Sequence, residues 1–217
     1  MRDGGANAAF KIMTFLGSWA GIKVEVRGLE KLKNHVGPAV LLSNHQSSID
    51  LMMLGHYMPD KCCIMSKKSL QYVPVFGIAG VFAHTIFIDR TDKTQALKSV
   101  EKSCDIINNS GFKLFMYPEG TRNHGHGLLP FKKGAFNIAV TGDIPIIPIV
   151  ISDYANFYSK PNKYFHNDGK VICEVLDQIK TVGMGKEDVN ALVEKTRNAM
   201  LECYERISKE VERPNQS

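Results

Sequence analysis

The stretch Ser43-Asn44-His45-Gln46-Ser47-Ser48-Ile49-Asp50 joins an apolar run, Ala39 to Leu42, to a helical pattern over Ser48 to Tyr57. It therefore predicts a buried strand that passes into a helix. In a continuous helix, side chains five residues apart point about 140° away from each other, so His45 and Asp50 would not meet there. Across a loop and a first helical turn they can meet. The Asp50 carboxylate could then hold one ring nitrogen of His45 while the other ring nitrogen faces a substrate.

A purely structural interpretation of this stretch stays open. Ser47, followed three residues later by Asp50, also fits a capping box, in which two side chains bind backbone N–H groups at the start of a helix. His45 would then be an ordinary loop residue. Residue types and spacing alone do not separate a capping box from a pair that acts as a general base.

A second segment carries groups that suit a phosphate. Tyr117-Pro118-Glu119-Gly120-Thr121-Arg122 follows an apolar run, Phe112 to Met116, which predicts a strand. The segment combines a hydroxyl and a guanidinium with backbone amides near a glycine, and such groups bind phosphate oxygens. The alternative is a solvated turn that ends a strand.

Four blocks, taken in order, resemble those of the glycerolipid acyltransferase family, and most closely those of the 1-acylglycerol-3-phosphate O-acyltransferases. The resemblance extends from about Val24 to Val150. Two positions depart mildly from the commoner family pattern, with Tyr117 in place of Phe and Ile144 in place of Val. The four blocks are Asn44 to Asp50, Ile86 to Arg90, Tyr117 to Arg122 and Ile144 to Pro148.

The resemblance implies an activity and roles for the first block. It implies transfer of a fatty acyl group from acyl-CoA, as co-substrate, to the sn-2 hydroxyl of lysophosphatidic acid, forming phosphatidic acid without any cofactor. His45 is then the general base, because imidazole changes its charge near neutral pH, and Asp50 orients it. The substrate itself supplies the nucleophilic hydroxyl, so no acyl-enzyme is expected.

The resemblance also implies residues that bind the acceptor. Arginine suits a phosphate because its planar guanidinium can donate two parallel hydrogen bonds. Glu119 would repel a phosphate, so it is expected to orient Arg122 or to bind a glycerol hydroxyl. Lys67 is either a further phosphate ligand or a solvated lysine. The acceptor-binding residues implied are Arg90, Glu119, Gly120, Thr121 and Arg122.

The fourth block contains Pro145 and Pro148. The family associates this block with the acyl-chain or acceptor pocket, and a purely structural role is the alternative. Because proline has no backbone N–H, the block is expected to end a strand or to lie at the edge of a sheet rather than to cross its centre.

Short apolar runs alternate with helical patterns, which predicts a single α/β domain with a mixed, mostly parallel sheet covered by helices. The resemblance adds a glycerol-3-phosphate acyltransferase-like fold. We expect an acyltransferase domain over 24–212, an amphipathic N-terminal segment over 1–23 and a flexible tail over 213–217. Strands are expected at 22–26, 39–42, 62–65, 82–88, 112–116, 145–151 and 171–175, and helices at 48–57, 70–79, 94–108, 132–141 and 187–210.

Composition narrows the classes of partner. The net charge of +5 suits anionic partners, but no Lys/Arg-rich run with interleaved aromatic residues indicates nucleic acid. Five cysteines without Cys-x-x-Cys spacing indicate neither a disulfide framework nor a zinc site. His124 and His126, in a glycine-rich loop, are expected to stay without a metal. Basic residues gather within or beside the blocks: Lys67, Lys68, Arg90, Arg122, Lys132 and Lys133.

Membrane contact is expected at the surface rather than across the bilayer. The apolar stretch 12–22 is about half of the roughly 20 residues that a spanning helix needs. It suits a short interfacial helix, and packing on the protein's own core is the alternative. The loop over 152–168 carries five aromatic residues that either touch lipid or anchor the loop. The family resemblance adds the endoplasmic reticulum membrane as the location.

Other functions stay open. Within the same family, the acceptor could be glycerol-3-phosphate or another lysophospholipid. Outside it, the chain could be a metal-assisted lipid hydrolase that uses His45, Asp50 and His124, or a non-catalytic lipid-binding module. The presence of both His45 and Asp50 favours a transferase over a binding module, because a module that only binds lipid has no need of a base.

Overall fold

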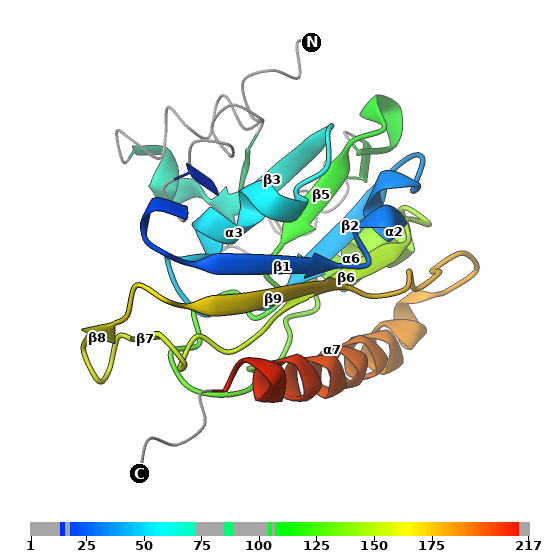
Figure 1. Cartoon of the computed structure of the whole chain (residues 1–217). Coiled ribbons are helices and arrows are strands. Elements are labelled where there is room, and N and C mark those ends of the chain that lie inside the picture. The colour runs from blue at the N-terminus through cyan, green and yellow to red at the C-terminus, as the bar shows by residue number, and fades with distance from the viewer. Residues whose placement is uncertain (1–13, 16–17, 73–84, 89–103, 106, 213–217) are drawn as a thin grey trace.

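The structure is a computed structural model of the whole chain, and it describes residues 14–15, 18–72, 85–88, 104–105 and 107–212. Among these residues, seven strands form one sheet in the order β1-β9-β6-β2-β5-β3-β4 (Figure 1). A separate pair, β7 (Tyr158–Ser159) and β8 (Tyr164–Phe165), lies in the loop after β6. The sheet strands are β1 (Lys23–Arg27), β2 (Ala39–Ser43), β3 (Cys62–Lys67), β4 (Ile86–Ile88), β5 (Lys113–Met116), β6 (Ile146–Ile151) and β9 (Lys170–Val175).

The sheet is mixed but mostly parallel. Strands β4, β3, β5, β2 and β6 run in one direction, each parallel to its neighbour. Strand β9 is antiparallel to β6, and β1 is parallel to β9. The predicted α/β class and mixed sheet are therefore confirmed, because each apolar run that the sequence marks forms a strand of this sheet. Of the expected strand over 82–88, positions 82–84 lie outside the described residues.

Helices cover both faces of the sheet (Figure 1). Helices α2 (Leu29–Lys33) and α3 (Asp50–Tyr57) pack on one face, and α6 (Gly134–Thr141) and α7 (Val189–Val211) pack on the other. Two short 3-10 helices are η1 (Lys68–Tyr72) and η2 (Lys186–Asp188). The expected helix over 94–108 lies mostly outside the described residues.

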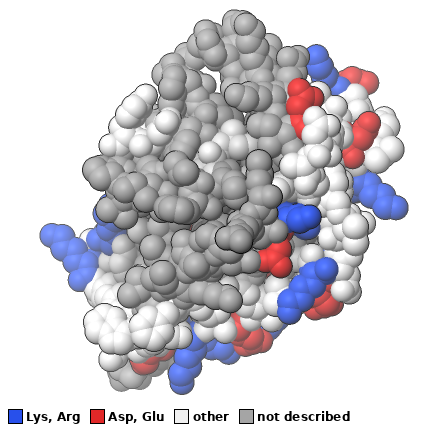
Figure 2. All heavy atoms as spheres, turned by 90° about the horizontal axis from the view of Figure 1, so that it is seen from above, with Lys and Arg blue, Asp and Glu red and all other residues white. Residues whose placement is uncertain are grey.

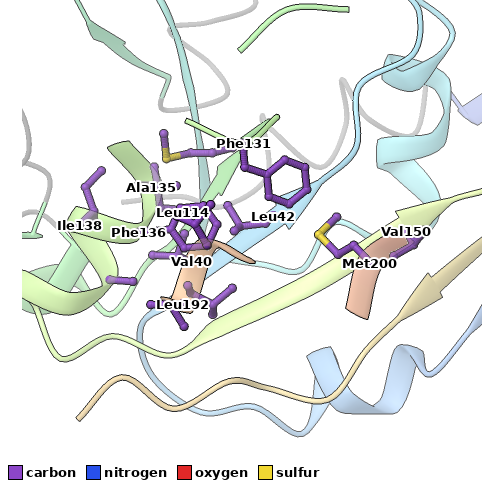
Figure 3. Packing of buried hydrophobic residues seen from close by; sticks show 14 of the residues in the cluster. Val40, Leu42, Leu114, Phe131, Ala135, Phe136, Ile138, Val150, Leu192 and Met200 are labelled. Carbon is purple, nitrogen blue, oxygen red and sulfur yellow. The ribbon is translucent and has the colours of Figure 1, made fainter. Parts of the chain in front are cut away.

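Strand β2 shows why this sequence needs two helical layers. Its side chains alternate between the two faces, as in any strand, and all of them are buried. Val40 and Leu42 pack toward α6 and α7, while Ala39 and Leu41 pack toward α3. Figure 3 shows Val40 and Leu42 beside Phe136 of α6. Full burial of one such aliphatic side chain contributes about 1.5–3 kcal/mol, so the strand is held from both sides.

Pro148 corrects the prediction for the fourth block. It lies inside β6, a central strand between β9 and β2, and not at a strand end or a sheet edge. Its carbonyl accepts the Leu176 N–H at 2.9 Å, so its nitrogen faces the β9 side. There Ile149 pairs with Val175 and Ile146 pairs with Ile179, so the neighbouring chain has one residue more than β6 over this stretch. Such a bulge removes the need for an N–H at Pro148.

The expected N-terminal interfacial segment is described only in part. Phe15 and Trp19 are exposed, whereas Ile22 is buried against the core. Among the described residues no helix combines the length and the apolar character that crossing a membrane requires. The predicted division at residues 23 and 212 is not tested by these observations.

Candidate active site

Three neighbouring strands bring the sequence blocks together. Strands β2, β5 and β6 are parallel, and β2 lies between the other two, so their carboxyl ends meet at one edge. The first block follows β2, the third block follows β5, and a loop that begins at Ser152 follows β6. Ligands of open α/β sheets bind at this edge of the strands.

His45 and Asp50 form the predicted pair. The distance between His45 Nδ1 and Asp50 Oδ2 is 2.6 Å. Helix α3 begins at Asp50, so the pair spans the loop and the first residue of the helix, as the spacing predicts. The His45 ring is partly buried and the Asp50 carboxylate is fully buried. The other ring nitrogen, Nε2, makes no hydrogen bond with a described residue and is available to a substrate.

The Asp50 carboxylate also binds the backbone of the loop that precedes α3. Its Oδ2 atom accepts the backbone N–H groups of Gln46 at 2.9 Å and Ser47 at 3.1 Å. Its Oδ1 atom accepts the hydroxyl of Tyr154 at 2.7 Å. One carboxylate thus contacts His45, holds the loop before α3 and accepts the Tyr154 hydroxyl.

Tyr117 fixes the plane of the His45 ring. The two rings stack with their centroids 3.9 Å apart and their planes 14° apart. Phe115 of β5 packs edge-on against Tyr117 at 5.0 Å. The Tyr117 hydroxyl is buried and has no hydrogen-bond partner among the described residues. Burial raises the pKa of Tyr117, so the hydroxyl stays neutral.

Glu119 and Asn123 hold the backbone of His45 on both sides. Glu119 Oε1 accepts the His45 N–H at 2.8 Å, and the His45 carbonyl accepts the Asn123 N–H at 2.7 Å. Glu119 Oε2 accepts the Leu129 N–H at 2.9 Å. Burial raises the pKa of Glu119, and these two N–H donors lower it. The buried Glu119 carboxylate therefore holds the backbone of His45 in place, and its expected roles toward Arg122 or a glycerol hydroxyl stay predictions.

The turn at Gly120 borders two cations. Gly120 has a φ of 70°, which favours glycine, and a Cβ placed there would lie 2.9 Å from Lys132 Nζ. Lys132 is held by its own N–H, which donates to the Pro118 carbonyl at 2.8 Å. Thr121 and Arg122 are exposed, and Arg122 makes no ion pair with a described residue. Two cationic side chains thus belong to one turn beside His45.

Two predicted phosphate ligands are not placed. Arg90 lies outside the described residues. Lys67 belongs to β3, where it pairs with Ile88, but its side chain is not described. In the sheet order β5 lies between β2 and β3, so Lys67 is on the same side of β2 as the turn that carries Arg122. The roles of Arg90 and Lys67 stay predictions, as does the acyl-chain role of Pro145 and Pro148.

Asn44 and Gln46 have structural roles that the sequence did not reveal. Asn44 exchanges two hydrogen bonds with the backbone of Ile151, at 2.9 and 2.8 Å. Gln46 Nε2 donates to the Ser152 carbonyl at 2.9 Å. These amides tie the first block to the end of β6. Their partners lie more than a hundred residues away, so only the two polar residues flanking His45 could have hinted at them.

A second histidine and aspartate pair lies in the loop after the third block. His126 Nδ1 contacts Asp153 Oδ2, and the Tyr204 hydroxyl donates to the same oxygen at 3.0 Å. Among the described residues, no three His, Cys, Asp or Glu side chains form a group that could hold a metal ion. On the face seen in Figure 2, the described basic and acidic side chains stand mixed around the rim.

This chain is similar to known acyltransferases. The acyltransferase family model matches residues 23–152. A putative 1-acyl-sn-glycerol-3-phosphate acyltransferase from Caenorhabditis elegans is 44% identical over 97% of this chain and 74% of its own length. The 1-acyl-sn-glycerol-3-phosphate acyltransferase alpha of Mus musculus is 39% identical over 87% of this chain. This chain spans 66% of the mouse protein's length, a little under two thirds.

The fold also matches a solved structure. The crystal structure of PlsC, the 1-acyl-sn-glycerophosphate (LPA) acyltransferase of Thermotoga maritima, aligns with a TM-score of 0.70 and 21% sequence identity. The alignment covers 91% of this chain and 78% of that one. The expected fold and the family resemblance are both confirmed. The chain belongs to the acyltransferase family.

Proposed function

We propose that this acyltransferase moves a fatty acyl group from acyl-CoA to the sn-2 hydroxyl of 1-acyl-sn-glycerol-3-phosphate, forming phosphatidic acid for phospholipid synthesis. The observation that carries the proposal is the His45 and Asp50 pair, 2.6 Å apart, beside a turn bordered by two cations. The named relatives are 1-acyl-sn-glycerol-3-phosphate acyltransferases, which supports this acceptor.

The first step uses His45 as the base. Nε2 of His45 takes the proton of the acceptor hydroxyl while the oxygen attacks the thioester carbon. A new carbon–oxygen bond forms, and the carbonyl electron pair moves to the oxygen of a tetrahedral intermediate. Asp50 holds the ring through Nδ1 and stabilises the imidazolium that results, as the carboxylate does in the serine protease triad.

The second step returns the proton. The carbonyl bond re-forms, the carbon–sulfur bond breaks, and coenzyme A leaves with the electron pair on sulfur. The His45 imidazolium gives its proton to this thiolate, so the products are the ester and the free thiol. His45 ends neutral and the enzyme is never acylated. No cofactor takes part, because proton transfer and two substrates account for every atom.

The turn after β5 would hold the acceptor. A phosphomonoester carries nearly two negative charges and three acceptor oxygens, and it needs cations that are not already paired. Arg122 is exposed two residues after Gly120, and the Lys132 side chain lies against Gly120. The Arg122 guanidinium can bind bidentately, and Lys132 adds a point charge. Arg90 is a further proposed ligand of this phosphate.

The substrates imply a membrane surface. Both the acceptor and the product carry acyl chains, so the protein would act where those chains are embedded. The exposed Phe15 and Trp19 side chains support contact with such a surface, because large apolar side chains are otherwise costly to leave in water. The endoplasmic reticulum is the membrane that we propose.

The proposal is tested by coenzyme A release in mild detergent. Long-chain acyl-CoA is mixed with lysophosphatidic acid, glycerol-3-phosphate, lysophosphatidylcholine or no acceptor, and wild type is compared with His45→Ala. We expect release that needs lysophosphatidic acid and is lost in His45→Ala. A preference for another acceptor would replace the proposed substrate. Release without an acceptor would mean hydrolysis, and equal release by both proteins would remove His45 as the base.

A further inference from the structure

Tyr154 contacts the oxygen of Asp50 that does not face His45. Its hydroxyl donates to Asp50 Oδ1 at 2.7 Å, while His45 Nδ1 lies at 2.6 Å from Oδ2. The Tyr154 side chain is 3% exposed, so this contact is shielded from water. Three side chains therefore form one buried line of hydrogen bonds that ends at the His45 ring.

The chain around Tyr154 is fixed. Its carbonyl accepts the N–H groups of Phe157 and Tyr158, at 2.9 and 2.8 Å. Its ring packs edge-on against Phe157, with the centroids 5.5 Å apart. Just before it, Ser152 is tied to the first block through Gln46. The hydroxyl is therefore held in place by its own loop as well as by Asp50.

The protonation state of Tyr154 sets the direction of its hydrogen bond with Asp50. Burial raises the pKa of Tyr154 well above 10, so the hydroxyl keeps its proton and acts as a donor to Asp50. The other titratable groups that interact with Asp50 are Tyr57, Tyr117, Cys173 and Glu119. Burial raises the pKa of Tyr57, Tyr117 and Cys173, so they stay neutral, and burial also raises the pKa of Glu119. Of the three tyrosines, Tyr154 is the one whose hydroxyl donates to the Asp50 carboxylate.

We propose that Tyr154 is a positioning residue that completes a Tyr154–Asp50–His45 relay. Its hydroxyl stops rotation of the carboxylate and withdraws part of its charge, which sets how tightly Asp50 holds the His45 imidazolium. It acts through Asp50 and does not touch the substrate. The inference rests on the proposed role of His45 as the base.

The matched control is another buried tyrosine. Tyr57, on α3, is 2% exposed, and its hydroxyl lies near Ser43 and donates no hydrogen bond to Asp50. Tyr57→Phe and Tyr154→Phe therefore remove the same atom from the same side of the sheet. Only the second change removes a donor to Asp50.

The experiment measures the pH dependence of kcat/KM for lysophosphatidic acid in wild type and both variants. For Tyr154→Phe we expect kcat to fall about tenfold, since one charge-assisted hydrogen bond is lost, with KM for the acceptor unchanged. The acidic limb of the kcat/KM pH profile should shift to higher pH by about half to one unit. Without the Tyr154 donor, the Asp50 carboxylate is more negative and holds the His45 imidazolium more tightly. Tyr57→Phe should match wild type.

Two further measurements separate positioning from plain stability. In an Asp50→Asn background, Tyr154→Phe should have little additional effect on kcat, because the path through Asp50 is already broken. The low-field NMR signal of the His45 Nδ1 proton should move in Tyr154→Phe and stay in place in Tyr57→Phe. If Tyr154→Phe does not fold, 3-fluorotyrosine at position 154, a stronger donor of similar size, should move the acidic limb downward.

The outcomes are distinguishable. An unchanged pH profile and an unmoved proton signal in folded Tyr154→Phe would overturn the relay, even if the melting temperature falls. Loss of activity with an unchanged profile and full additivity with Asp50→Asn would also overturn it. If wild type and His45→Ala release coenzyme A equally, the proposed function fails instead, and the proton signal still tests the hydrogen-bonded line.

Discussion

Two histidine and aspartate pairs among the residues that the structure describes have nearly the same hydrogen bonds. In each, a histidine Nδ1 meets an aspartate Oδ2, and the aspartate also accepts a tyrosine hydroxyl. Burial separates them. The side chains of His45 and Asp50 are 19% and 1% exposed, whereas those of His126 and Asp153 are 80% and 17% exposed. A hydrogen-bond pattern alone therefore does not mark the base.

Anchoring separates the pairs as well. The His45 ring stacks on Tyr117, and the backbone N–H and carbonyl of His45 are held by Glu119 and Asn123. The His126 carbonyl has only a 3.5 Å contact with Asn123. An exposed pair is screened by water and loses side-chain entropy when it forms, so it contributes little. The comparison predicts that equal substitutions in the two pairs have unequal effects.

The largest difference is expected for alanine at the two histidines. His45→Ala should lower kcat/KM by about 10²–10⁴-fold, the usual contribution of a general base, with the fold intact. His126→Ala should stay within about twofold of wild type, because its ring is mostly in water. The assay is acyl transfer to lysophosphatidic acid, with circular dichroism as the check on folding. Equal losses in both variants would end the distinction between the pairs.

Asparagine at the two aspartates tests stability along with activity. Asp50 accepts hydrogen bonds from four groups. In Asp50→Asn an amide NH₂ replaces one accepting oxygen, so buried donors lose their acceptor, which costs about 1–3 kcal/mol of unfolding free energy. Asp50→Asn should therefore melt earlier and lose most activity. Asp153→Asn should melt slightly earlier and keep most activity. Thermal unfolding and initial rates measure both, and a larger activity loss in Asp153→Asn would contradict the comparison.

Glu119→Gln tests the backbone anchor that the second pair lacks. Both carboxylate oxygens accept backbone N–H groups, and glutamine has only one such oxygen. The variant should lose about 1–3 kcal/mol of unfolding free energy and several-fold in kcat. KM for the acceptor should change little, because Glu119 is buried away from it. A raised KM with normal stability would instead return Glu119 to substrate binding.

Two glycines in the same loop region give a smaller, matched contrast. Gly120 and Gly127 both have positive φ, 70° and 79°, so alanine at either costs about 1–2 kcal/mol of backbone strain. At Gly120 the new methyl group would also displace the Lys132 ammonium, whereas nothing lies within 4 Å at Gly127. Only Gly120→Ala should raise KM for the acceptor, by a few-fold. Steady-state kinetics of both variants with lysophosphatidic acid measure these KM values. Equal KM values would show that Lys132 does not bind the acceptor phosphate.

Local contacts were predictable from the sequence, and distant ones were not. Residues His45 and Asp50 lie in one loop and turn, so their spacing was enough to predict the pair. Tyr154 lies 104 residues from Asp50, and Glu119 lies 74 residues from His45. The periodicity of apolar residues along the sequence does not indicate such distant partners. Tyr154 could be named only as one aromatic residue of a loop.

The strands show the same difference between what the sequence predicts and what it does not. The apolar runs of β2, β5 and β6 predicted strands because parallel strands in the middle of a sheet are buried on both faces. The place of Pro148 was predicted wrongly because a proline fits a central strand only where its neighbour bulges. That bulge lies between Val175 and Ile179, a stretch whose pairing the proline itself does not reveal.

The smallest expected effect contrasts two tyrosine hydroxyls. Tyr117 stacks on His45 through its ring, and its buried hydroxyl has no partner among the described residues, so Tyr117→Phe keeps the stack and removes a group that was costly to bury. The variant should be as active as wild type and more stable by up to about 1 kcal/mol. Tyr204→Phe removes a hydrogen bond to Asp153 and should be slightly less stable. Opposite shifts in melting temperature are therefore expected, and a clear loss of activity in Tyr117→Phe would show that its hydroxyl, rather than its ring, serves His45.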